Sequence, residues 1–445
     1  MYSILLNELI MKNDKEHGEI TKDFSDFFSH ISYMSPTLKN ILNKRKKIND
    51  TEMIEWVKKL DDIKKVDFVT LSFIIICKNE ERTIRNCLNG IISGATTQDE
   101  ILVVDTGSVD NTKKIVSNYF KQVQVVETTW KDDFAEARNK AIMMAKRKWV
   151  FFIDADEVID CKSIENLRKY LRIIEWYNFK DIVISPTIIN SNRHVTNTVK
   201  RILRRDEEIT YFGKVHEEPR KKYENKFNLL NIAFDNIVIK HDGYKKEVVK
   251  SKNKVKRNYD LLIQMIEIEP DNPRWKYFLC RDCGGWLKQK VYEQYLLESL
   301  EMCEDEYEFQ RYKVCIITDL IRFYLNKNDN KKFDFYLKKL EEIAPQSSNI
   351  IFFKALCQYN GCIEQMGKLI NELLVYRNKK REIEYGSLHS GLYHIDFIIA
   401  QLLFTVEKYK DAFRIWKWLE MQEYGDAKSQ FRVLYNELAD FMQEP

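Results

Sequence analysis

The chain has 445 residues, of which 44% are hydrophobic and 31% charged, a balance that excludes a disordered chain and predicts more than one folded domain. A net charge of only +4 excludes a general electrostatic attraction to nucleic acid, so we expect no nucleic-acid partner. Nine cysteines scattered over this length favour reduced thiols in a cytoplasmic protein over a disulfide-rich secreted one.

The first part of the sequence, residues 1–67, carries apolar side chains at helical spacing and is predicted to be a short helical N-terminal segment. Residues 1–13 have neither the basic leader nor the long apolar core of a secretory signal. The longest strongly apolar runs, such as residues 69–77, are well short of the roughly 20 residues that a membrane span needs. We therefore expect a soluble, cytoplasmic protein without a membrane span.

Residues 68–250 alternate between strand and helix patterns. Continuous apolar, β-branched runs predict buried strands at residues 70–77, 100–105, 123–127 and 149–154. Amphipathic stretches between these runs predict helices, and the alternation is typical of βαβ units around a parallel sheet. We therefore predict an α/β domain here, with further short strands at residues 181–185, 198–203, 210–212 and 237–241.

Residues 251–445 lose the strand pattern and are predicted to form paired helices with aromatic faces. The segment Glu269–Pro273, followed by Trp275 and Phe278, resembles the start of a tetratricopeptide-type (TPR) helical hairpin. Residues 343–345 repeat part of this pattern about two repeat lengths later. We predict an all-α, TPR-like C-terminal domain, with an irregular helical bundle as the alternative.

Two cysteines of this helical region, Cys280 and Cys283, stand at the spacing of a zinc or redox motif. No second pair of Cys or His residues stands at ligand spacing, and the segment has a helical pattern. We therefore predict that both are buried structural thiols.

The strongest chemical signal is the sequence Asp154-Ala155-Asp156 at the end of the strand predicted at residues 149–154. The carboxyl end of a parallel strand faces the crevice where α/β sheets bind ligands. Acids this close repel one another unless a cation lies beside them, and Mg²⁺ or Mn²⁺ takes carboxylate oxygens together with substrate phosphate oxygens. Capping of the next helix, or exposure to solvent, is the alternative; the position in the α/β unit favours a metal site.

Polar residues also follow the first two predicted strands. Asp105 ends the second strand, where a carboxylate accepts hydrogen bonds from a ribose hydroxyl or a base N–H. The three residues Lys78, Asn79 and Glu80 follow the first strand and face the same crevice. The hydroxyl and carboxyl side chains after Asp105 are expected to cap the next helix.

Another polar group begins the helix predicted after the third strand. Asp133 is placed to cap that helix, and Arg138 lies about one turn further on. From there Arg138 reaches either a diphosphate or Asp154. A purely structural role for Arg138 is an equal alternative.

Together these motifs resemble family 2 glycosyltransferases, which have the GT-A fold. The resemblance covers roughly residues 68–245 and rests on four motifs in the family's order: Lys78-Asn79-Glu80, Asp105-Thr-Gly-Ser, Asp133-Phe-x-x-Ala-Arg138-Asn139 and Asp154-x-Asp156. The family's processivity signature and transmembrane helices are missing, which puts polymer synthesis and export in doubt.

Further motifs narrow the resemblance. The segments Phe212–Pro219 and Lys240–Tyr244, together with the helical prefix and the start of the helical region, are most similar to the sublancin-type bacteriocin S-glycosyltransferases (glycocin glycosyltransferases). The resemblance implies an inverting transfer of a hexose, expected to be glucose from UDP-glucose, onto a Cys or Ser of a bacteriocin precursor peptide. The alternatives are a glycan or lipid acceptor, or a helical-repeat scaffold with an inactive catalytic domain.

The resemblance also implies roles for individual residues. Nucleotide-sugar binding is expected of Lys78, Asn79, Glu80, Asp105, Asp133, Arg138, Asp154 and Ala155. A divalent metal, Mg²⁺ or Mn²⁺, is expected on Asp156, Asp154 and His241, although a neutral, hydrogen-bonded His241 is the alternative. Glu217, beside His216, is the expected catalytic base because a carboxylate near the acceptor takes its proton. The helical C-terminal domain is expected to bind the acceptor, to form a homodimer, or both.

Overall fold

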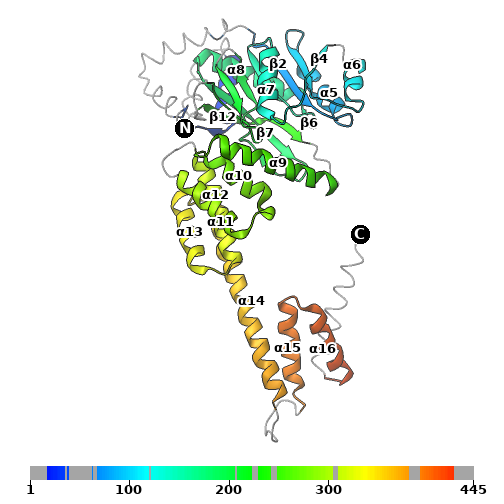
Figure 1. Cartoon of the computed structure of the whole chain (residues 1–445), viewed down its shortest axis with the longest axis vertical. Helices are drawn as coiled ribbons and strands as arrows, with labels where there is room; N and C mark the ends of the chain where they lie inside the picture. The colour runs from blue at the N-terminus through cyan, green and yellow to red at the C-terminus, as the bar shows by residue number, and fades with distance from the viewer. Residues whose placement is uncertain are drawn as a thin grey trace. The chain divides into compact units, whose positions relative to one another are not determined.

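The computed structural model describes residues 18–35, 38–39, 63, 68–119, 122–205, 208–222, 229–241, 248–303, 309–379 and 391–424. Contacts divide the chain into two compact units, Met1–Tyr312 and Lys313–Pro445 (Figure 1). The predicted boundaries at residues 67 and 250 stay predictions. The first unit extends past residue 250, and its described residues between 248 and 303 are mainly helical.

A mixed sheet forms the centre of the first unit. Its main path runs in the order β1 (Ile31–Met34), β12 (Leu230–His241), β7 (Ile182–Asn190), β9 (Ile202–Arg204), β5 (Trp149–Phe152), β2 (Leu71–Cys77), β3 (Glu100–Asp105) and β4 (Val123–Glu127). The four strands β5, β2, β3 and β4 are parallel, as predicted, whereas β9 is antiparallel to both of its neighbours. The short strand β6 (Glu157–Ile159) pairs with β12, and β8 (Val195–Thr196) pairs with β7. A separate hairpin consists of β10 (Ile209–Phe212) and β11 (Glu218–Lys221).

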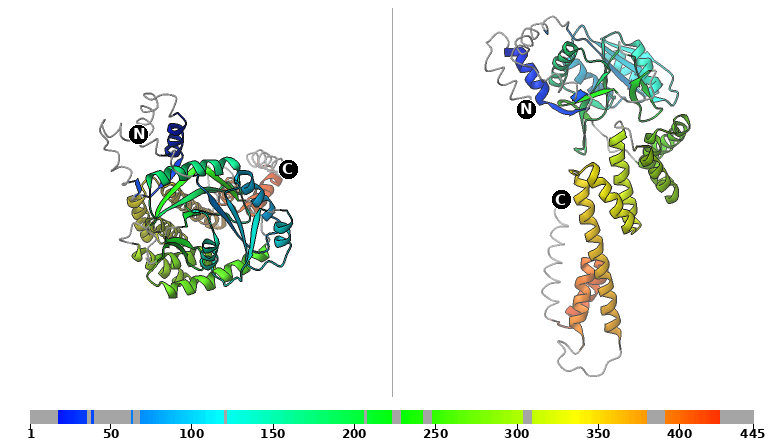
Figure 2. Two further views of the ribbon diagram at one scale, coloured as in Figure 1. Left: turned by 90° about the horizontal axis from the view of Figure 1, so that it is seen from above. Right: turned by 90° about the vertical axis from the view of Figure 1, so that its left-hand side faces the viewer.

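Helices cover both faces of this sheet (Figure 2). Because successive strand residues point to opposite faces, Phe73 and Ile75 pack in the core on the side of α5 (Ile84–Gly94) and α8 (Cys161–Tyr177). Ile74 packs in the second core, which includes alanines of α7 (Phe134–Met144). Both faces are buried, which explains the continuous apolar runs in the sequence. Helix α6 (Thr112–Tyr119) connects β3 and β4.

The N-terminal segment joins this core. Helix α2 (Gly18–Ser29) packs on α8, with the rings of Phe24 and Trp176 5.4 Å apart and those of Phe27 and Tyr170 5.6 Å apart. The next strand, β1, pairs antiparallel with β12 at the edge of the sheet. The sequence predicted only helix in this segment, so the added strand is a finding of the structure.

Three helices complete the first unit: α9 (Val248–Ile268), α10 (Pro273–Cys283) and α11 (Gln289–Met302). Asn272 caps α10 through the Arg274 N–H, and Pro273 occupies its first turn, where a missing N–H costs no hydrogen bond. A 3₁₀ turn, Gly284–Trp286, follows. Cys280 and Cys283 are buried, and each thiol donates to a backbone carbonyl 3.7 Å away, which confirms their prediction as structural thiols.

The described residues of the second unit form helices and their connections, as predicted. Helix α12 (Gln310–Asn326) begins at the boundary between the two units and is followed by α13 (Asn330–Ile343), α14 (Ser348–Asn378), α15 (Tyr393–Thr405) and α16 (Tyr409–Met421). Small and aromatic side chains of α15 and α16, including Ala400, Ala412 and Trp416, form one core with Ile370 of α14. Within the part of the chain that the structure describes, no helix is long and apolar enough to span a bilayer.

Candidate active site

The carboxyl ends of β2, β3 and β5 bring the predicted site residues to one edge of the sheet. Cys77 of β2 pairs in register with Asp105 of β3, and β5 runs parallel beside β2. Lys78–Glu80, Asp105 and Asp154–Asp156 therefore follow adjacent strand ends, where α/β sheets bind ligands. Lys78 is exposed and Ala155 is buried.

The loops after β2 and β3 are fixed to each other by hydrogen bonds. The buried Asp105 accepts from the N–H groups of Gly107 and Ser108 at 2.9 and 2.7 Å through its Oδ1. The Asn79 N–H donates to the Ser108 hydroxyl at 2.8 Å, and Asn79 has a left-handed φ of 57°. The Glu80 N–H donates to the Thr112 hydroxyl at 2.7 Å. Asp105 thus holds the turn beside it, and its contact with a ribose or base stays a prediction.

Asp154 is held by two hydrogen bonds from an arginine that the sequence analysis did not single out. Arg201, the residue before β9, donates to both carboxylate oxygens of Asp154 at 2.8 and 2.5 Å, and Arg138 of α7 lies 3.6 Å from one of them. Burial by itself would raise the pKa of Asp154. The charges of Arg201 and Arg138 outweigh burial and hold that pKa well below its usual range, so Asp154 is ionised.

Glu157 is a second residue that sequence reasoning missed. It is 3% exposed, accepts from the Asp154 N–H at 2.8 Å, and accepts from Arg201 at 3.2 Å. Burial, with the neighbouring charge of Asp154, raises the pKa of Glu157 to about 7, against the opposing effect of Arg201. The signal for this cluster in the sequence was Arg201 within the strand predicted at residues 198–203, because an arginine buried in a strand needs an acid to balance it.

His241 lies directly against Asp156. The short strand β6 pairs antiparallel with β12 so that His241 is opposite Glu157, and the His241 Nε2 is 3.1 Å from the Asp156 Oδ2. The other ring nitrogen, Nδ1, lies 2.8 Å from the Asn190 Oδ1, whose amide nitrogen donates to the His194 carbonyl. Nδ1 therefore carries a proton. Nε2 faces the Asp156 carboxylate, and because both atoms have lone pairs, either a second proton on the ring or a metal ion must lie between them. The hydrogen bond to Asp156 raises the pKa of His241, although partial burial acts in the opposite direction.

Arg138 connects this cluster to the predicted base. Its Nε donates to the Glu217 Oε1 at 2.7 Å, and its guanidinium lies 4.8 Å from the centre of the Phe152 ring. The adjacent His216 points elsewhere: its Nε2 lies 2.6 Å from the Asp282 Oδ2 on α10. The structure therefore brings Glu217 to the acidic cluster through Arg138 but does not bring the His216 ring with it.

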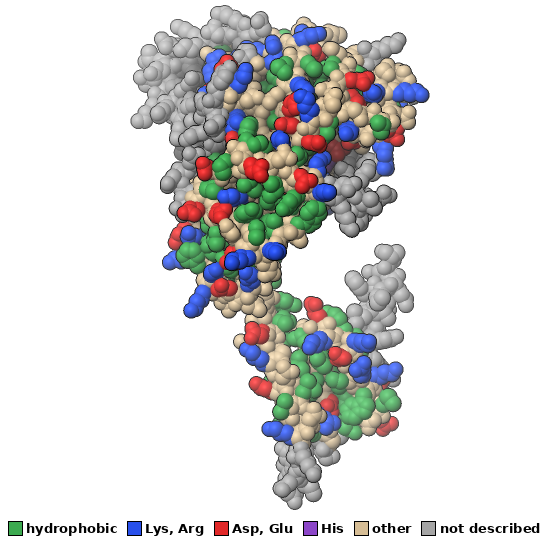
Figure 3. Space-filling view, in the orientation of Figure 1, with side chains coloured by type: hydrophobic (Ala, Val, Ile, Leu, Met, Phe, Trp, Pro, Cys, Tyr) green, Lys and Arg blue, Asp and Glu red, His purple; other side chains and the backbone are tan. Residues whose placement is uncertain are grey.

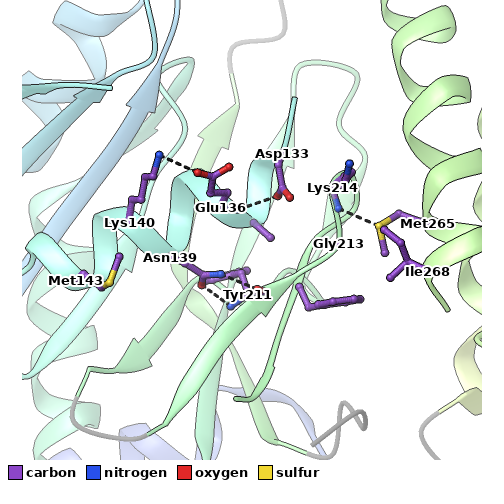
Figure 4. A pocket seen from close by; sticks show the side chains of 12 residues that line it. Asp133, Glu136, Asn139, Lys140, Met143, Tyr211, Gly213, Lys214, Met265 and Ile268 are labelled. Carbon is purple, nitrogen blue, oxygen red and sulfur yellow. Dashed lines mark hydrogen bonds and ion pairs between the residues drawn. The ribbon is translucent and has the colours of Figure 1, made fainter. Parts of the chain in front are cut away.

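Asp133 caps α7, as predicted, by accepting from the Glu136 N–H at 2.8 Å. It also lines a pocket of about 450 Å³ between α7, β10 and α9 (Figure 4). The walls of this pocket are largely apolar and are formed by Asp133, Ala135, Glu136, Asn139, Lys140, Met143, Tyr211, Phe212, Gly213, Lys214, Met265 and Ile268. Figure 3 shows hydrophobic side chains gathered over α9 and α10.

Comparison with known proteins identifies one domain of the chain. Residues 72–250 match the family described as glycosyl transferase family 2. These residues form a family 2 glycosyltransferase domain. The SPbeta prophage-derived glycosyltransferase SunS of Bacillus subtilis is 27% identical over 90% of this chain and 91% of its own length. A TPR repeat-containing protein of Synechococcus elongatus is 25% identical over 53% of this chain and 58% of its own length.

A solved structure of S. aureus TarS in complex with UDP-GlcNAc covers 62% of this chain and 92% of its own, with 15% identity and a TM-score of 0.33. The family match, together with the sheet order, confirms the predicted GT-A fold of the glycosyltransferase domain. The similarity to SunS over most of the chain confirms the resemblance to the sublancin-type enzymes.

The glycosyltransferase domain has the chemistry to share a divalent metal with a substrate. Within the described ranges, no group of three or more His, Cys, Asp or Glu side chains is arranged to hold a metal ion. Asp156 and His241 supply two ligands, while both oxygens of Asp154 are engaged by Arg201. Mg²⁺ and Mn²⁺ commonly take one or two protein ligands and complete their shells with water and phosphate oxygens, so these residues fit such an ion.

Asp282 of α10, the partner of His216, makes a pH-dependent contribution to stability. Burial by itself would raise its pKa, but hydrogen bonds from His216 and Arg281 hold that pKa well below its usual value. A group with a lowered folded-state pKa stabilises the fold above its unfolded pKa of about 3.9, and this contribution is lost as the pH falls through the folded-state value. We expect Asp282→Ala to lower the free energy of unfolding by about 2 kcal/mol near neutral pH. Urea unfolding should show this difference shrinking below about pH 4; a pH-independent difference would contradict the assignment.

Proposed function

We propose that this chain is an inverting, metal-dependent glycosyltransferase that moves a hexose, with UDP-glucose as the expected donor, onto a Cys or Ser side chain of a bacteriocin precursor peptide. The observation that carries the proposal is the Asp156–His241 pair at the carboxyl edge of the sheet, beside an Asp154 fixed by Arg201. The similarity to SunS along nearly the whole chain supports the peptide acceptor. A glycan or lipid acceptor is the alternative.

The charge balance of the site supports a role for a cation. Four carboxyl groups, those of Asp154, Asp156, Glu157 and Glu217, lie among two arginines and His241, so the cationic side chains of the cluster are already paired with acids before any donor binds. A diphosphate would be repelled by such a surface unless a cation came with it. Bound to Asp156 and His241, a divalent metal would neutralise charge on the leaving diphosphate.

The remaining residues of the site position the donor and the acceptor. Asp105 and Asn79 hold the two loops that face the nucleotide, and Arg201 keeps Asp154 in one orientation. Glu217 is the proposed base, with its second carboxylate oxygen available to the acceptor while Oε1 stays on Arg138. A thiol has a pKa of about 8.5 and needs less help from a base than a serine hydroxyl does.

The pocket between α7, β10 and α9 is the proposed position for an apolar side chain of the acceptor. Ile268 on its rim is 52% exposed and Met143 is 76% exposed, although both are apolar. Lys214, which also lines the pocket, belongs to the segment between β10 and β11 that carries Glu217. Residues of α9 also line the pocket, which supports an acceptor site made partly by the helical region.

We expect Ile268→Asp to raise the KM for the precursor peptide about tenfold. The apolar contact that Ile268 would make with the bound peptide is replaced by a carboxylate, which must lose its water when the peptide binds. The KM for the donor should not change. Steady-state kinetics of both substrates measure this, with Glu267→Ala, on the same turn of α9 but outside the pocket, as the control. An unchanged peptide KM in Ile268→Asp would place the acceptor elsewhere.

A homodimer through the helical C-terminal half is also proposed. On α14, Phe352, Tyr359 and Met366 recur at heptad spacing, with Cys362 and Leu369 at the intervening seam positions. Phe352, Tyr359 and Leu369 are 56%, 52% and 43% exposed, which is unusual for large apolar side chains on one helix face. A second copy of the same helix would cover this seam.

Sedimentation tests the dimer. The double variant Tyr359→Glu/Leu369→Glu should convert it to a monomer, because four like charges would then face each other in the seam. Lys368→Ala, on the outer face of the same helix, should leave the dimer intact. A monomeric wild type at micromolar concentration would remove this part of the proposal.

Donor turnover tests the glycosyltransferase activity itself. The wild-type protein is incubated with Mg²⁺ or Mn²⁺ and a panel of UDP- and GDP-sugars, and the released nucleotide is measured with and without a cysteine-containing precursor peptide. We expect release from one UDP-hexose that rises with the peptide. No release from any donor under these conditions would favour the inactive scaffold.

A further inference from the structure

The loop that carries the proposed base has an unusual backbone. It joins β10 to β11 and contains Gly213 with φ 110° and His216 with φ 53°. A left-handed conformation is unfavourable for a residue with a side chain and persists only where the surroundings impose it. Asparagine and aspartate adopt it by bonding to their own backbone, but the His216 ring is bonded to another element.

Helix α10 imposes this conformation through contacts with His216 from Asp282, Phe278, Arg274 and Arg281, the last of which lies 3.1 Å from the His216 Nε2. The Asp282 Oδ2 lies 2.6 Å from the His216 Nε2, and the Phe278 ring lies 4.4 Å from the His216 ring. The fully buried Arg274 donates to the His216 carbonyl at 2.8 Å, so both the side chain and the backbone of His216 are held. The helix is also close to Gly213, where a Cβ atom would lie 2.7 Å from the Trp275 ring.

Glu218, the residue after Glu217, holds the other end of the loop between β10 and β11. Its carboxylate is 3.1 Å from the Lys200 ammonium and 2.8 Å from the Tyr312 hydroxyl, and it is paired with Arg274 and Arg311. Burial by itself would raise the pKa of Glu218, but these cations hold it well below its usual value. Successive residues of an extended chain point to opposite sides, so Glu217 faces Arg138 while Glu218 faces the helices.

We infer that Asp282 and Arg274 are positioning residues for Glu217, and that α10 therefore belongs to the catalytic machinery rather than to an independent helical domain. The inference rests on the proposed role of Glu217. The left-handed turn at His216 directs the Glu217 side chain to the Arg138 Nε, 2.7 Å away. Without the contacts from Asp282 and Arg274, the loop relaxes to a negative φ at His216 and Glu217 leaves the cluster.

The test uses the full chain and compares Asp282→Ala, Asp282→Asn and Lys276→Gln. Lys276 is the matched control, since it lies on α10 but pairs with Glu298 of α11 at 2.8 Å and does not contact the loop. Amide hydrogen exchange is measured over residues 213–221 and, as an internal reference, over residues 100–105. We expect Asp282→Ala to speed exchange in the loop about tenfold without changing the reference. Asp282→Asn, which keeps an acceptor for His216, should recover most of the protection, and Lys276→Gln should match wild type.

Transfer kinetics give the second readout. Asp282→Ala should lower kcat about tenfold with the donor KM unchanged, since it moves the base and not the nucleotide site. Loop exchange in Asp282→Ala equal to wild type, or equal rises in Asp282→Ala and Lys276→Gln, would overturn the inference. The exchange result stands whether or not the acceptor tested is the true one, so a failure of the proposed function is seen separately, as absent transfer by wild type.

Discussion

Replacing Asp156 with alanine is expected to abolish sugar transfer, with a loss of at least about 10³-fold in kcat, because it removes a protein ligand of the proposed metal. His241 would then face a gap in place of the carboxylate 3.1 Å from its Nε2. The variant should remain folded, since Asp156 is partly exposed and its carboxylate is not part of the buried Arg201 cluster. Initial rates of transfer at saturating donor, with Mg²⁺ and with Mn²⁺, measure the loss.

Two controls separate metal binding from other causes of that loss. Asp235→Ala removes an exposed carboxylate from the same strand as His241 and should leave the rate unchanged. Manganese should raise the melting temperature of wild type in the presence of UDP but not that of Asp156→Ala. An Asp156→Ala enzyme that keeps a tenth or more of the wild-type rate would contradict the assignment of Asp156 as a metal ligand.

The second large effect is expected for Arg201→Met, which should lower the free energy of unfolding by about 2–3 kcal/mol. Arg201 is 6% exposed and neutralises Asp154 and Glu157 together, so its removal leaves the buried Glu157 and the partly exposed carboxylate of Asp154 without their main partner. Activity should fall with stability, because Asp154 loses the bidentate contact that orients it. Urea denaturation near neutral pH measures the change.

Arg205→Met is the matched control, since Arg205 is exposed and, among the residues that the structure describes, donates to the backbone carbonyl of Arg147. The double variant Arg201→Met/Glu157→Gln should recover part of the lost stability, because one of the two stranded acids then carries no charge. A loss below about 1 kcal/mol for Arg201→Met would show that the site tolerates unpaired acids, against the geometry described here.

Much of the sheet was predictable because its strands are buried on both faces. The runs at residues 70–77 and 100–105 correspond to β2 and β3 almost residue for residue, since Ser72 is the only polar residue between their first and last positions. The strand β1 was not predicted, because a four-residue edge strand with two exposed side chains has little apolar pattern. Its pairing with β12 depends on the completed sheet.

The site was predictable where a motif lies at a strand end. Asp154 and Asp156 follow β5, and His241 ends β12, so chain order placed them near one edge. Arg201 and Asp282 were not found, because each meets its partner only in the folded protein, 47 and 66 residues away in the sequence. The role of Glu157 was not predicted for a different reason. In the sequence it is one more acid next to a polar turn, and only the structure shows that it is buried.

The peptide acceptor and the metal are tested together by one measurement. This is the intact mass of a cysteine-containing bacteriocin precursor peptide after incubation with this protein, Mg²⁺ and UDP-glucose. We predict a mass increase of one hexose that fragmentation places on a cysteine or serine, and that is lost with EDTA and with Asp156→Ala. Consumption of the donor with no change in the mass of any precursor peptide would contradict the peptide acceptor, and a hexose added equally well in EDTA would contradict the role of the metal.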